Sequence, residues 1–364
     1  MKWAEIVSPI FVVGIRDFEW NQELDSFLNE FPVAGLSLFN SPHDSEDFIW
    51  KDPDLALEKL YEFLRKAEGR IQFLAADQEG GRVRRLKKPF INLPPAQKIG
   101  EYFNRAGGLD KIFELYSLAA QQLSLAGVQL NFAPVCDLRT SATTQIIQDR
   151  SFSEKADEVI RLARLFCEAM ETSSVRCVLK HFPGHGPTSI DSHEKVAIID
   201  KDPYLYERED RKIFEECAAS AFGIMTAHVA LPEKPERILS LDIDFIKACK
   251  RQMPTHLIWM TDDLLTMKAV NEMKPWISCF HAEYNYINLC NTLDQSASAI
   301  EDVIYDLENR SLSFDEVQKI EMRSRHSLEN FQFLPIENEF KTWKKKILAL
   351  SQQAEDLMHQ EALI

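Results

Sequence analysis

Short apolar segments alternate with stretches of helical periodicity along most of this 364-residue chain, and this alternation constrains the fold most strongly. The eight apolar segments are Ile6–Ile15, Ala34–Phe39, Ile71–Ala76, Val128–Pro134, Cys177–His181, Gly223–His228, His256–Thr261 and Tyr284–Cys290. None alternates cleanly between apolar and polar residues, which is typical of strands buried on both faces of a parallel sheet. Eight such strands with helical crossovers predict an α/β fold of the (β/α)8 TIM-like barrel type. A doubly wound open sheet is the main alternative, because a strand count does not prove closure.

The helical segments that separate these strands are Leu55–Ala67, Leu109–Ala126, Ala156–Thr172, Tyr204–Ala221, Ile243–Arg251 and Ser296–Asn309. After the seventh strand we expect only a short helix, around Leu264–Met273. The tail is strongly helical, and its apolar stripe consists of Phe340, Trp343, Ile347, Leu350 and Leu357. We therefore predict a single barrel domain over residues 1–310 and a C-terminal helical extension over 311–364 that packs on its outside. A partner-binding helix is the alternative for the tail.

The net charge and the cysteine content indicate which kinds of binding partner and which cellular compartment suit this chain. The chain has 42 basic and 57 acidic residues and a formal net charge of −15, which argues against nucleic-acid binding. No apolar run reaches the roughly 18 residues of a membrane span. The N-terminal apolar stretch contains Glu5 and Pro9 and lacks a small-residue cleavage site, so we predict a strand there and not a signal peptide. Seven scattered cysteines without a Cys-x-x-Cys pair indicate a reduced, cytoplasmic protein.

Polar residues gather where the predicted strands end. They are Asp77 to Arg82 after the third strand, Asp137 and Arg139 after the fourth, Lys180 and His181 in the fifth, His228 in the sixth, and Asp262 and Asp263 after the seventh. In a parallel barrel these ends open onto one face, where active sites are built. Gly80 and Gly81 predict a close approach of the backbone to a ligand, although no nucleotide-binding motif is present.

Two adjacent carboxylates, Asp262 and Asp263, follow an apolar strand directly. Such residues either cap the next helix or present an acid to a site. Because adjacent side chains diverge, one can cap while the other faces the cavity. A metal site is a further alternative, although no other acidic ligand stands close in sequence.

The segment from Lys180 to His193, KHFPGHGPTSIDSH, holds three of the nine histidines, and its prolines and glycines predict a loop. Histidine clusters often bind zinc. Asp191 and His193 are two residues apart, so in an extended loop both lie on one side, and the carboxylate can orient the imidazole. General acid/base catalysis, metal binding and a purely structural role all remain open at this point. Arg150 similarly could hold a ligand or pair with its neighbour Asp149.

Six stretches together resemble a known family. They occur in the order Asp77–Val83, Asn131–Leu138, Asp149–Phe152, Lys180–His193, Met225–Val229 and Thr261–Leu264. This pattern resembles the family 3 glycoside hydrolases, in their single-domain β-N-acetylglucosaminidase branch, over about residues 6 to 330. The KHFPGHG…DSH loop is the most discriminating feature, because it separates this branch from the two-domain β-glucosidases.

The resemblance implies a retaining mechanism in which a histidine replaces the usual carboxylic acid. Asp262 would be the nucleophile, His193 the acid/base, and Asp191 the residue that orients His193. A histidine has an intrinsic pKa of about 6.5 and can exchange protons near neutral pH without the burial that a glutamic acid requires. The usual alternative uses two carboxyl groups about 5–5.5 Å apart.

The resemblance also implies a substrate and the residues that bind it. The sugar-binding side chains would be Asp77, Arg85, Arg150, Lys180 and His181, with His228 and Asp263 behind them. The substrate would be a terminal β-linked N-acetylglucosamine, carried on 1,6-anhydro-N-acetylmuramoyl fragments in cytoplasmic cell-wall recycling. We expect no cofactor, no metal, no nucleic-acid partner and no membrane span. A monomer is the working expectation for the oligomeric state.

Departures from the family pattern leave other activities open. Thr261 stands where serine is usual, and Glu283 and Asn285 stand where an Ala-Gly-x-Asp sequence is expected. These positions lie outside the three proposed catalytic residues. The alternatives are a β-glucosidase or a glycoside phosphorylase on the same scaffold, a weakly active sugar-binding barrel, and a metallohydrolase that uses His181, His185 and His193.

Overall fold

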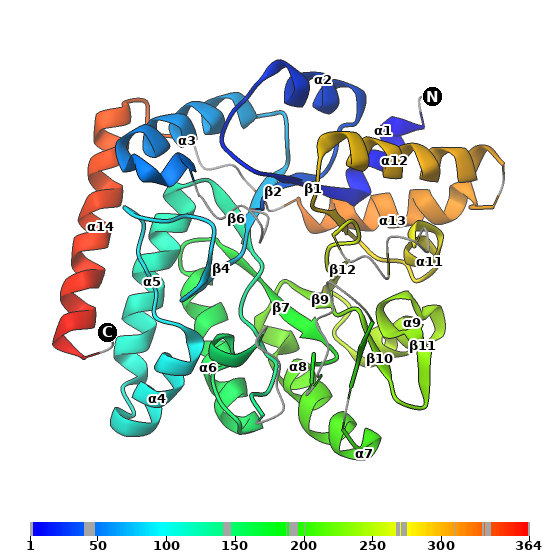
Figure 1. Cartoon of the computed structure of the whole chain (residues 1–364). Coiled ribbons are helices and arrows are strands. Elements are labelled where there is room, and N and C mark those ends of the chain that lie inside the picture. The colour runs from blue at the N-terminus through cyan, green and yellow to red at the C-terminus, as the bar shows by residue number, and fades with distance from the viewer. Residues whose placement is uncertain are drawn as a thin grey trace.

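Eight parallel strands form a closed barrel in the computed structural model (Figure 1). The model describes residues 3–39, 48–140, 147–186, 188, 196–199, 201–266, 270, 275–309, 311–329, 331 and 336–362. The strands are β1 (Phe11–Ile15), β2 (Gly35–Leu38), β3 (Phe73–Ala76), β6 (Val128–Asn131), β7 (Arg176–Phe182), β9 (Gly223–Thr226), β12 (Ile258–Thr261) and β13 (Ile287–Leu289). Their order is β12-β9-β7-β6-β3-β2-β1-β13. A parallel bridge between Met260 and Tyr286 joins the two ends of this series. The predicted barrel is confirmed, and the open-sheet alternative is wrong.

All eight predicted strands exist, but most are shorter than predicted, and the first one differs most. Residues Ala4–Val7 form helix α1 and Ser8–Ile10 a 3-10 turn, so β1 begins at Phe11 and not at Ile6. Pro9 lies at the start of this turn. Proline has no backbone N–H to give to a sheet and a φ that suits a helical start, so the apolar N-terminal stretch enters the barrel as a turn.

Two apolar layers enclose the sheet. Val12, Phe73 and Met260 belong to the cluster inside the barrel, whereas Phe11 and Val13 pack outward against the helices. Neighbouring residues of a strand point to opposite faces, and here both faces are buried. This double burial is the physical reason that the strands read as unbroken apolar runs.

The helices cover the outside of the barrel. They are α2 (Gln22–Glu30), α3 (Pro53–Ala67), α4 (Ala96–Ala106), α5 (Leu109–Leu125), α6 (Ala156–Glu171), α7 (Pro203–Tyr206), α8 (Lys212–Cys217), α9 (Ile243–Gln252), α11 (Trp276–His281) and α12 (Leu293–Glu308). The sequence prediction named none of α2, α4 and α11. The predicted helix Tyr204–Ala221 is not regular, because a π-helical turn at Glu207–Arg211 separates α7 from α8. The short helix predicted around Leu264–Met273 falls largely outside the described residues.

Two C-terminal helices pack on different sides of the barrel (Figure 1). Helix α13 (Phe314–Ser327) lies against the N-terminal turn, and helix α14 (Phe340–Gln360) lies along α5. Trp343 is buried and its indole N–H donates to the Leu125 carbonyl at 2.8 Å. The predicted apolar stripe of the tail therefore faces the helices of the barrel. The domain boundary at residue 310 stays a prediction.

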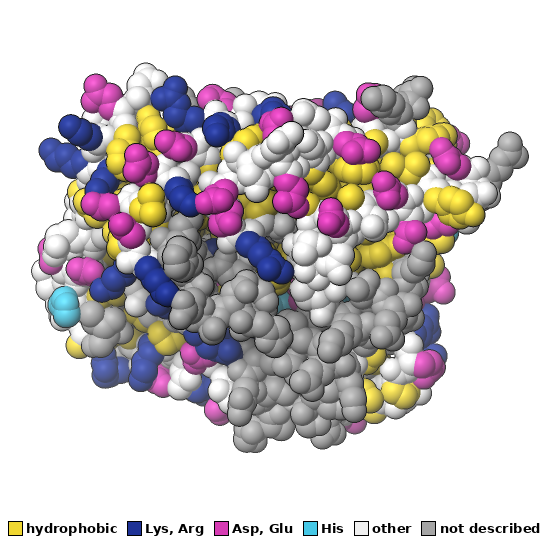
Figure 2. Space-filling view, turned by 45° about the horizontal axis from the view of Figure 1, so that its top comes forward, with side chains coloured by type: hydrophobic (Ala, Val, Ile, Leu, Met, Phe, Trp, Pro, Cys, Tyr) yellow, Lys and Arg dark blue, Asp and Glu magenta, His cyan; other side chains and the backbone are white. Residues whose placement is uncertain are grey.

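Two small sheets accompany the barrel: the hairpin of β4 (Gln78–Gly80) and β5 (Val83–Arg84), and the sheet of β8 (Ala197–Ile198), β10 (Val229–Leu231) and β11 (Lys234–Ile238). On the face shown in Figure 2, acidic and basic side chains are interspersed among apolar ones over the described surface. Within the described residues, no helix has the length and apolar character needed to cross a membrane.

Candidate active site

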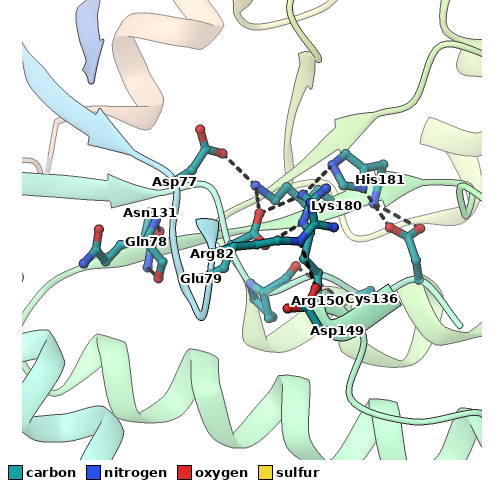
Figure 3. A network of polar contacts seen from close by, with 12 residues as sticks. Asp77, Gln78, Glu79, Arg82, Asn131, Cys136, Asp149, Arg150, Lys180 and His181 are labelled. Atoms are coloured by element: carbon teal, nitrogen blue, oxygen red, sulfur yellow. Dashed lines mark hydrogen bonds and ion pairs between the residues drawn. The ribbon is translucent and has the colours of Figure 1, made fainter. Parts of the chain in front are cut away.

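The predicted polar residues of β3 and β7 come together at the carboxyl end of the barrel (Figure 3). Asp77 follows β3 directly, and Lys180 and His181 lie near the end of β7, two strands away in the sheet. A charged residue from a third element, Glu79 of the β4–β5 hairpin, reaches the same point. The convergence expected from the strand ends is therefore present in the fold.

Lys180 is the centre of this cluster. Its Nζ lies 2.6 Å from Asp77 Oδ1 and 2.5 Å from Glu79 Oε1, and only 2% of its side chain is exposed. Arg85 contacts the other oxygen of Asp77, with Nη2 at 2.8 Å from Oδ2. Asp77 is thus held between two cations, and its carboxylate orientation is fixed from both sides.

Glu79 and Arg150 form the second half of the cluster. Arg150 Nε and Nη2 each donate to a different Glu79 oxygen at 2.8 Å, the bidentate geometry that suits a guanidinium best. Arg150 does not pair with its neighbour Asp149, which instead pairs with Arg82 at 2.9 Å on the surface. Sequence reasoning missed Glu79 as a site residue. The only signal was its place in a run of strand-end charges, because its partner Arg150 lies 71 positions away.

The two carboxylates of the cluster are held in their charged forms. Burial alone would raise the pKa of Asp77, but the charges of Lys180 and Arg85 outweigh it and hold that pKa below its usual range. Burial is likewise outweighed at Glu79, where Arg150 and Lys180 lower the pKa to about 2. Ionised groups fixed in a buried site make strong hydrogen bonds to neutral hydroxyls and need no reorganisation to do so.

His181 is oriented by Asp137, which follows β6. His181 Nδ1 lies 2.7 Å from Asp137 Oδ2, and the backbone N–H of His185 donates to Asp137 Oδ1 at 2.7 Å. Asp137 is buried; burial would raise its pKa, but the nearby His181 and His185 hold it down. With its Nδ1 proton directed at this carboxylate, His181 presents Nε2 to the cluster, 3.4 Å from Arg150 Nη2. The sequence marked Asp137 as a strand-end residue but gave it no partner.

His185 lies deeper than the predicted loop position suggested. Its side chain is buried, and its ring centre lies 6.0 Å from that of His181. Burial lowers the pKa of His185 to about 4, against the opposing effect of Asp137. His185 is therefore neutral at physiological pH.

The end of β12 carries the predicted pair of carboxylates. Asp263 is buried and caps the following turn, since its Oδ1 accepts the Leu265 N–H at 3.1 Å and its Oδ2 the Thr266 N–H at 2.9 Å. Burial raises the pKa of Asp263 to about 6, although these hydrogen bonds oppose the shift. Asp262 is half-buried and its Oδ1 accepts the Asp263 N–H at 2.8 Å. Asp263 is therefore the capping member of the pair, and the expectation that its neighbour faces the cavity stays a prediction.

Asp262 differs from the other carboxylates of the site in its partners. Within the described part of the chain, no lysine, arginine or histidine side chain lies at ion-pairing distance from it. Cys290 follows β13, and its backbone N–H donates to Asp263 Oδ1 at 2.7 Å, which joins the ends of β12 and β13. Burial raises the pKa of the Cys290 thiol. Because β3 and β12 are parallel strands of one barrel, the carboxylates that follow them lie at the same end of the barrel.

The glycines of the hairpin pack closely against the protein's own backbone, and their predicted approach to a ligand stays a prediction. Gly80 has a φ of +110°, and a Cβ there would lie 2.6 Å from the Pro94 carbonyl oxygen. At Gly81 a Cβ would lie 2.7 Å from Pro95 Cβ. The close approach is to the protein's own chain, which lets the hairpin turn Glu79 inward.

Two of the predicted catalytic residues, Asp191 and His193, lie outside the described residues. Among the residues that the structure does describe, no group of three or more histidine, cysteine, aspartate or glutamate side chains has a metal-binding arrangement. The described site thus offers fixed charges suited to a polyhydroxylated ligand. It also offers the Asp262 carboxylate, which has no described cation beside it and which, unlike Asp263, does not cap the following turn.

Comparisons with known proteins agree with this chemistry. The family model described as "Glycosyl hydrolase family 3 N terminal domain" matches residues 3–278. A β-hexosaminidase from Xylella fastidiosa (strain M12) is 34% identical over 265 residues, which cover 72% of this chain and 76% of the relative. A β-hexosaminidase from Idiomarina loihiensis is 33% identical over 225 residues, 61% of this chain and 64% of the relative.

Solved structures share the fold. A glycoside hydrolase family 3 β-N-acetylglucosaminidase from Paenibacillus sp. str. FPU-7 superimposes with a TM-score of 0.79 at 20% identity, over 98% of this chain and 69% of that one. Native NagZ from Neisseria gonorrhoeae superimposes with a TM-score of 0.71 at 20% identity, over 94% of this chain and 97% of that one. At such identities the superpositions establish the barrel fold alone. The chemistry of the site has to be inferred from its residues.

Proposed function

This chain belongs to glycoside hydrolase family 3, and from that premise we propose that it is a retaining exo-β-N-acetylglucosaminidase. Its relatives named β-hexosaminidase support the sugar class. The observation that carries the proposal is the contrast between Asp262, which no described cation neutralises, and the fully paired carboxylates opposite it. A nucleophilic carboxylate must be ionised and have an oxygen available for attack.

In the first step an oxygen of Asp262 attacks the anomeric carbon, and the bond from that carbon to the leaving oxygen breaks. His193 gives its proton to the leaving oxygen, and Asp191 orients and stabilises the imidazolium. In the second step His193 takes a proton from water, the water oxygen bonds to the anomeric carbon, and the Asp262 carboxylate leaves. The sugar is released with the β configuration that it had in the substrate.

The state of the described carboxyl groups supports a histidine as the acid. Asp77, Glu79 and Asp137 all have lowered pKa values, so none of them carries a proton to donate near neutral pH. Asp263 has a pKa of about 6, but backbone N–H groups and Thr266 occupy its oxygens. None of these four carboxyl groups is thus available to protonate the leaving group, which favours the assignment to His193.

The charged cluster would bind the non-reacting part of the sugar. Asp77 would accept hydrogen bonds from ring hydroxyls, while Lys180 and Arg150 would donate to hydroxyl and acetamido oxygens. His181 would accept from a hydroxyl at Nε2, and Arg85 would fix Asp77. These roles fit the geometry because each side chain is already held by a partner within 3.4 Å. Binding then requires little ordering of side chains.

We further propose that the substrate is a terminal β-linked N-acetylglucosamine on a 1,6-anhydro-N-acetylmuramoyl fragment, processed in cytoplasmic cell-wall recycling. Seven free cysteines, all buried, support a reducing compartment. The aglycone assignment comes from the family resemblance, and hydrolysis of such a fragment, with release of N-acetylglucosamine, tests it directly.

The decisive experiment measures hydrolysis of 4-nitrophenyl N-acetyl-β-glucosaminide beside 4-nitrophenyl β-glucoside, and follows the anomer first released by proton NMR. We expect cleavage of the acetamido substrate with release of the β-anomer. Preference for the glucoside would favour a β-glucosidase, and release of a sugar phosphate that depends on added phosphate would favour a phosphorylase. Loss of activity with EDTA would favour a metallohydrolase, and binding without turnover a sugar-binding barrel.

A further inference from the structure

A buried chain of hydrogen bonds runs behind the β12 carboxylates. Thr226 Oγ1 lies 2.9 Å from Tyr284 Oη, which donates to the Ser240 carbonyl at 2.8 Å. Ser240 Oγ lies 2.7 Å from His228 Nδ1, and His228 Nε2 lies 3.2 Å from the Asp263 carbonyl oxygen. All five residues are buried, with between 0% and 5% of their surface exposed. These hydrogen bonds join β9, the turn after β11, the segment between α11 and β13, and the end of β12.

The partners of His228 fix its tautomer. A carbonyl oxygen can only accept, so Nε2 carries the proton that is directed at Asp263, and Nδ1 accepts from the Ser240 hydroxyl. Burial lowers the pKa of His228, against the opposing charge of Asp262, and this keeps the ring neutral. Both nitrogens are then satisfied in one orientation of the ring, which makes His228 a rigid support.

This support acts on the turn that carries Asp262. The Asp262 N–H donates to the Thr226 carbonyl at 3.2 Å, and Asp262 Oδ1 accepts the N–H of Asp263 at 2.8 Å. Asp263 is held by its carbonyl through His228 and by its carboxylate through the Cys290 N–H at 2.7 Å. The orientation of the Asp262 carboxylate therefore depends on the placement of Asp263.

We propose that the chain Thr226–Tyr284–Ser240–His228 positions the Asp262 carboxylate for attack, with His228 acting through the Asp263 carbonyl as a positioning residue. The proposal rests on the role of Asp262 in the proposed function. Because Oδ1 accepts the Asp263 N–H, Oδ2 is the oxygen that reaches the anomeric carbon. A small displacement of this turn would slow the covalent step while leaving the sugar-binding cluster of β3 and β7 in place.

The test measures the covalent step alone. A 5-fluoro derivative of N-acetyl-β-glucosaminyl fluoride transfers its sugar to the nucleophile: the bond from the anomeric carbon to Asp262 forms, and fluoride leaves without needing a proton. The rate of mass gain at saturating probe reports the attack by Asp262, and peptide mapping identifies the labelled residue. The dissociation constant of N-acetylglucosamine reports the binding cluster separately.

The protein contains a matched control for each of two residues. They are Tyr286, two positions from Tyr284, and Ser324 in helix α13, which serves as the control for Ser240. Tyr284 and Tyr286 are both fully buried, and their hydroxyls donate to the carbonyls of Ser240 and Ser324 at 2.8 and 2.9 Å. Tyr284→Phe breaks the proposed chain, whereas Tyr286→Phe removes the same group from the contact with α13. Ser240→Ala and Ser324→Ala form a second pair, since both hydroxyls are buried and hydrogen-bonded.

We expect Tyr284→Phe and Ser240→Ala to slow labelling about 10-fold or more, a loss typical of a misplaced reacting group. The control variants should label within about two-fold of wild type, and all four should bind N-acetylglucosamine as wild type does. His228→Gln, whose amide can still donate to the Asp263 carbonyl, should label faster than His228→Leu. Faster labelling of His228→Gln would show that the hydrogen bond to the Asp263 carbonyl matters, because a role in packing alone would not depend on it.

Two results would overturn the inference, and they are distinguishable. If wild type is labelled at Asp262 but the variants of the chain label as fast as their controls, the positioning role is wrong and the proposed function stands. If wild type is labelled at another residue or not at all, Asp262 is not the nucleophile, and both proposals fail together.

Discussion

Asp77 and Glu79 each contact two cationic side chains at the carboxyl end of the barrel, whereas the described partners of Asp262 are backbone groups. Both regions are made of carboxylates at strand ends, and only the partners differ. A carboxylate between two cations is ionised and immobile, which suits the binding of neutral hydroxyls. A carboxylate without a neighbouring cation has an oxygen lone pair that can attack carbon. The pairing pattern therefore separates the binding half of the site from the reacting half.

The reacting half should be sensitive to a change of one atom. Asp262→Asn replaces a carboxylate oxygen by an amide and should lower kcat by about 10³-fold or more, because the covalent step is lost. The melting temperature should change little, since no described ion pair is broken. Turnover of 4-nitrophenyl N-acetyl-β-glucosaminide and a thermal melt measure both effects, and near-normal turnover would remove Asp262 from the mechanism.

Substitutions in the binding half should instead lower the free energy of unfolding of the protein. Lys180→Met leaves two buried carboxylates short of a cation, and we expect a loss of about 3–5 kcal/mol in the free energy of unfolding. Urea denaturation measures this loss, with Lys155→Met as the control. Lys155 forms a similar 2.8 Å contact with Glu158, but 75% of its side chain is exposed. A cost at Lys180 no larger than at Lys155 would contradict the comparison.

Glu79 links Lys180 and Arg150, two cations of the binding half, so its removal should affect binding and stability together. Glu79→Gln keeps the shape but loses the charge opposite Arg150 and Lys180. We expect a loss of about 1–3 kcal/mol in stability, typical for buried hydrogen bonds to charged groups. The dissociation constant of N-acetylglucosamine should rise in parallel, which isothermal calorimetry can measure. Unchanged affinity would show that Arg150 holds its place without Glu79.

The pH dependence of the free energy of unfolding should also depend on Glu79. The pKa of Glu79 falls from 4.5 to about 2 on folding, so its contribution is complete above the unfolded value and is lost as the pH drops. The stability difference between wild type and Glu79→Gln should therefore shrink between about pH 5 and about pH 3. Urea denaturation at several pH values measures this difference. A constant difference would mean that folding does not shift the pKa of Glu79.

The smallest effect is expected at Asp149, the neighbour of Arg150. Its 2.9 Å contact with Arg82 is close in length to the buried 2.8 Å contact between Arg150 and Glu79, but 37% and 48% of the Asp149 and Arg82 side chains are exposed. Asp149→Asn should cost no more than about 1 kcal/mol, because water screens exposed pairs. Turnover should stay close to that of wild type. A large effect on either quantity would show that burial is not what separates the two pairs.

Local sequence patterns predicted the barrel well and its start poorly. The eight apolar runs correspond to the eight strands because burial on both faces requires apolar residues at every position. The N-terminal run was misread because apolar content alone does not distinguish a strand from a buried turn, and Pro9 decided the outcome. Glu283 illustrates a related point. It stands where the family resemblance expects glycine, and its φ of 60° is the left-handed conformation that glycine adopts most easily.

The sequence by itself determined the strand ends at which the chemistry lies and, through the family resemblance, the residues proposed for catalysis. It did not determine the partners: Glu79 with Arg150, Asp137 with His181 and His228 with the turn of Asp262 became visible only in the fold. A strand end can be recognised from neighbouring residues in the sequence, because an apolar run is followed by charged residues. Ion pairs join residues from different strands, and only barrel closure brings those residues within 3 Å and out of water, where the pairing sets their charge.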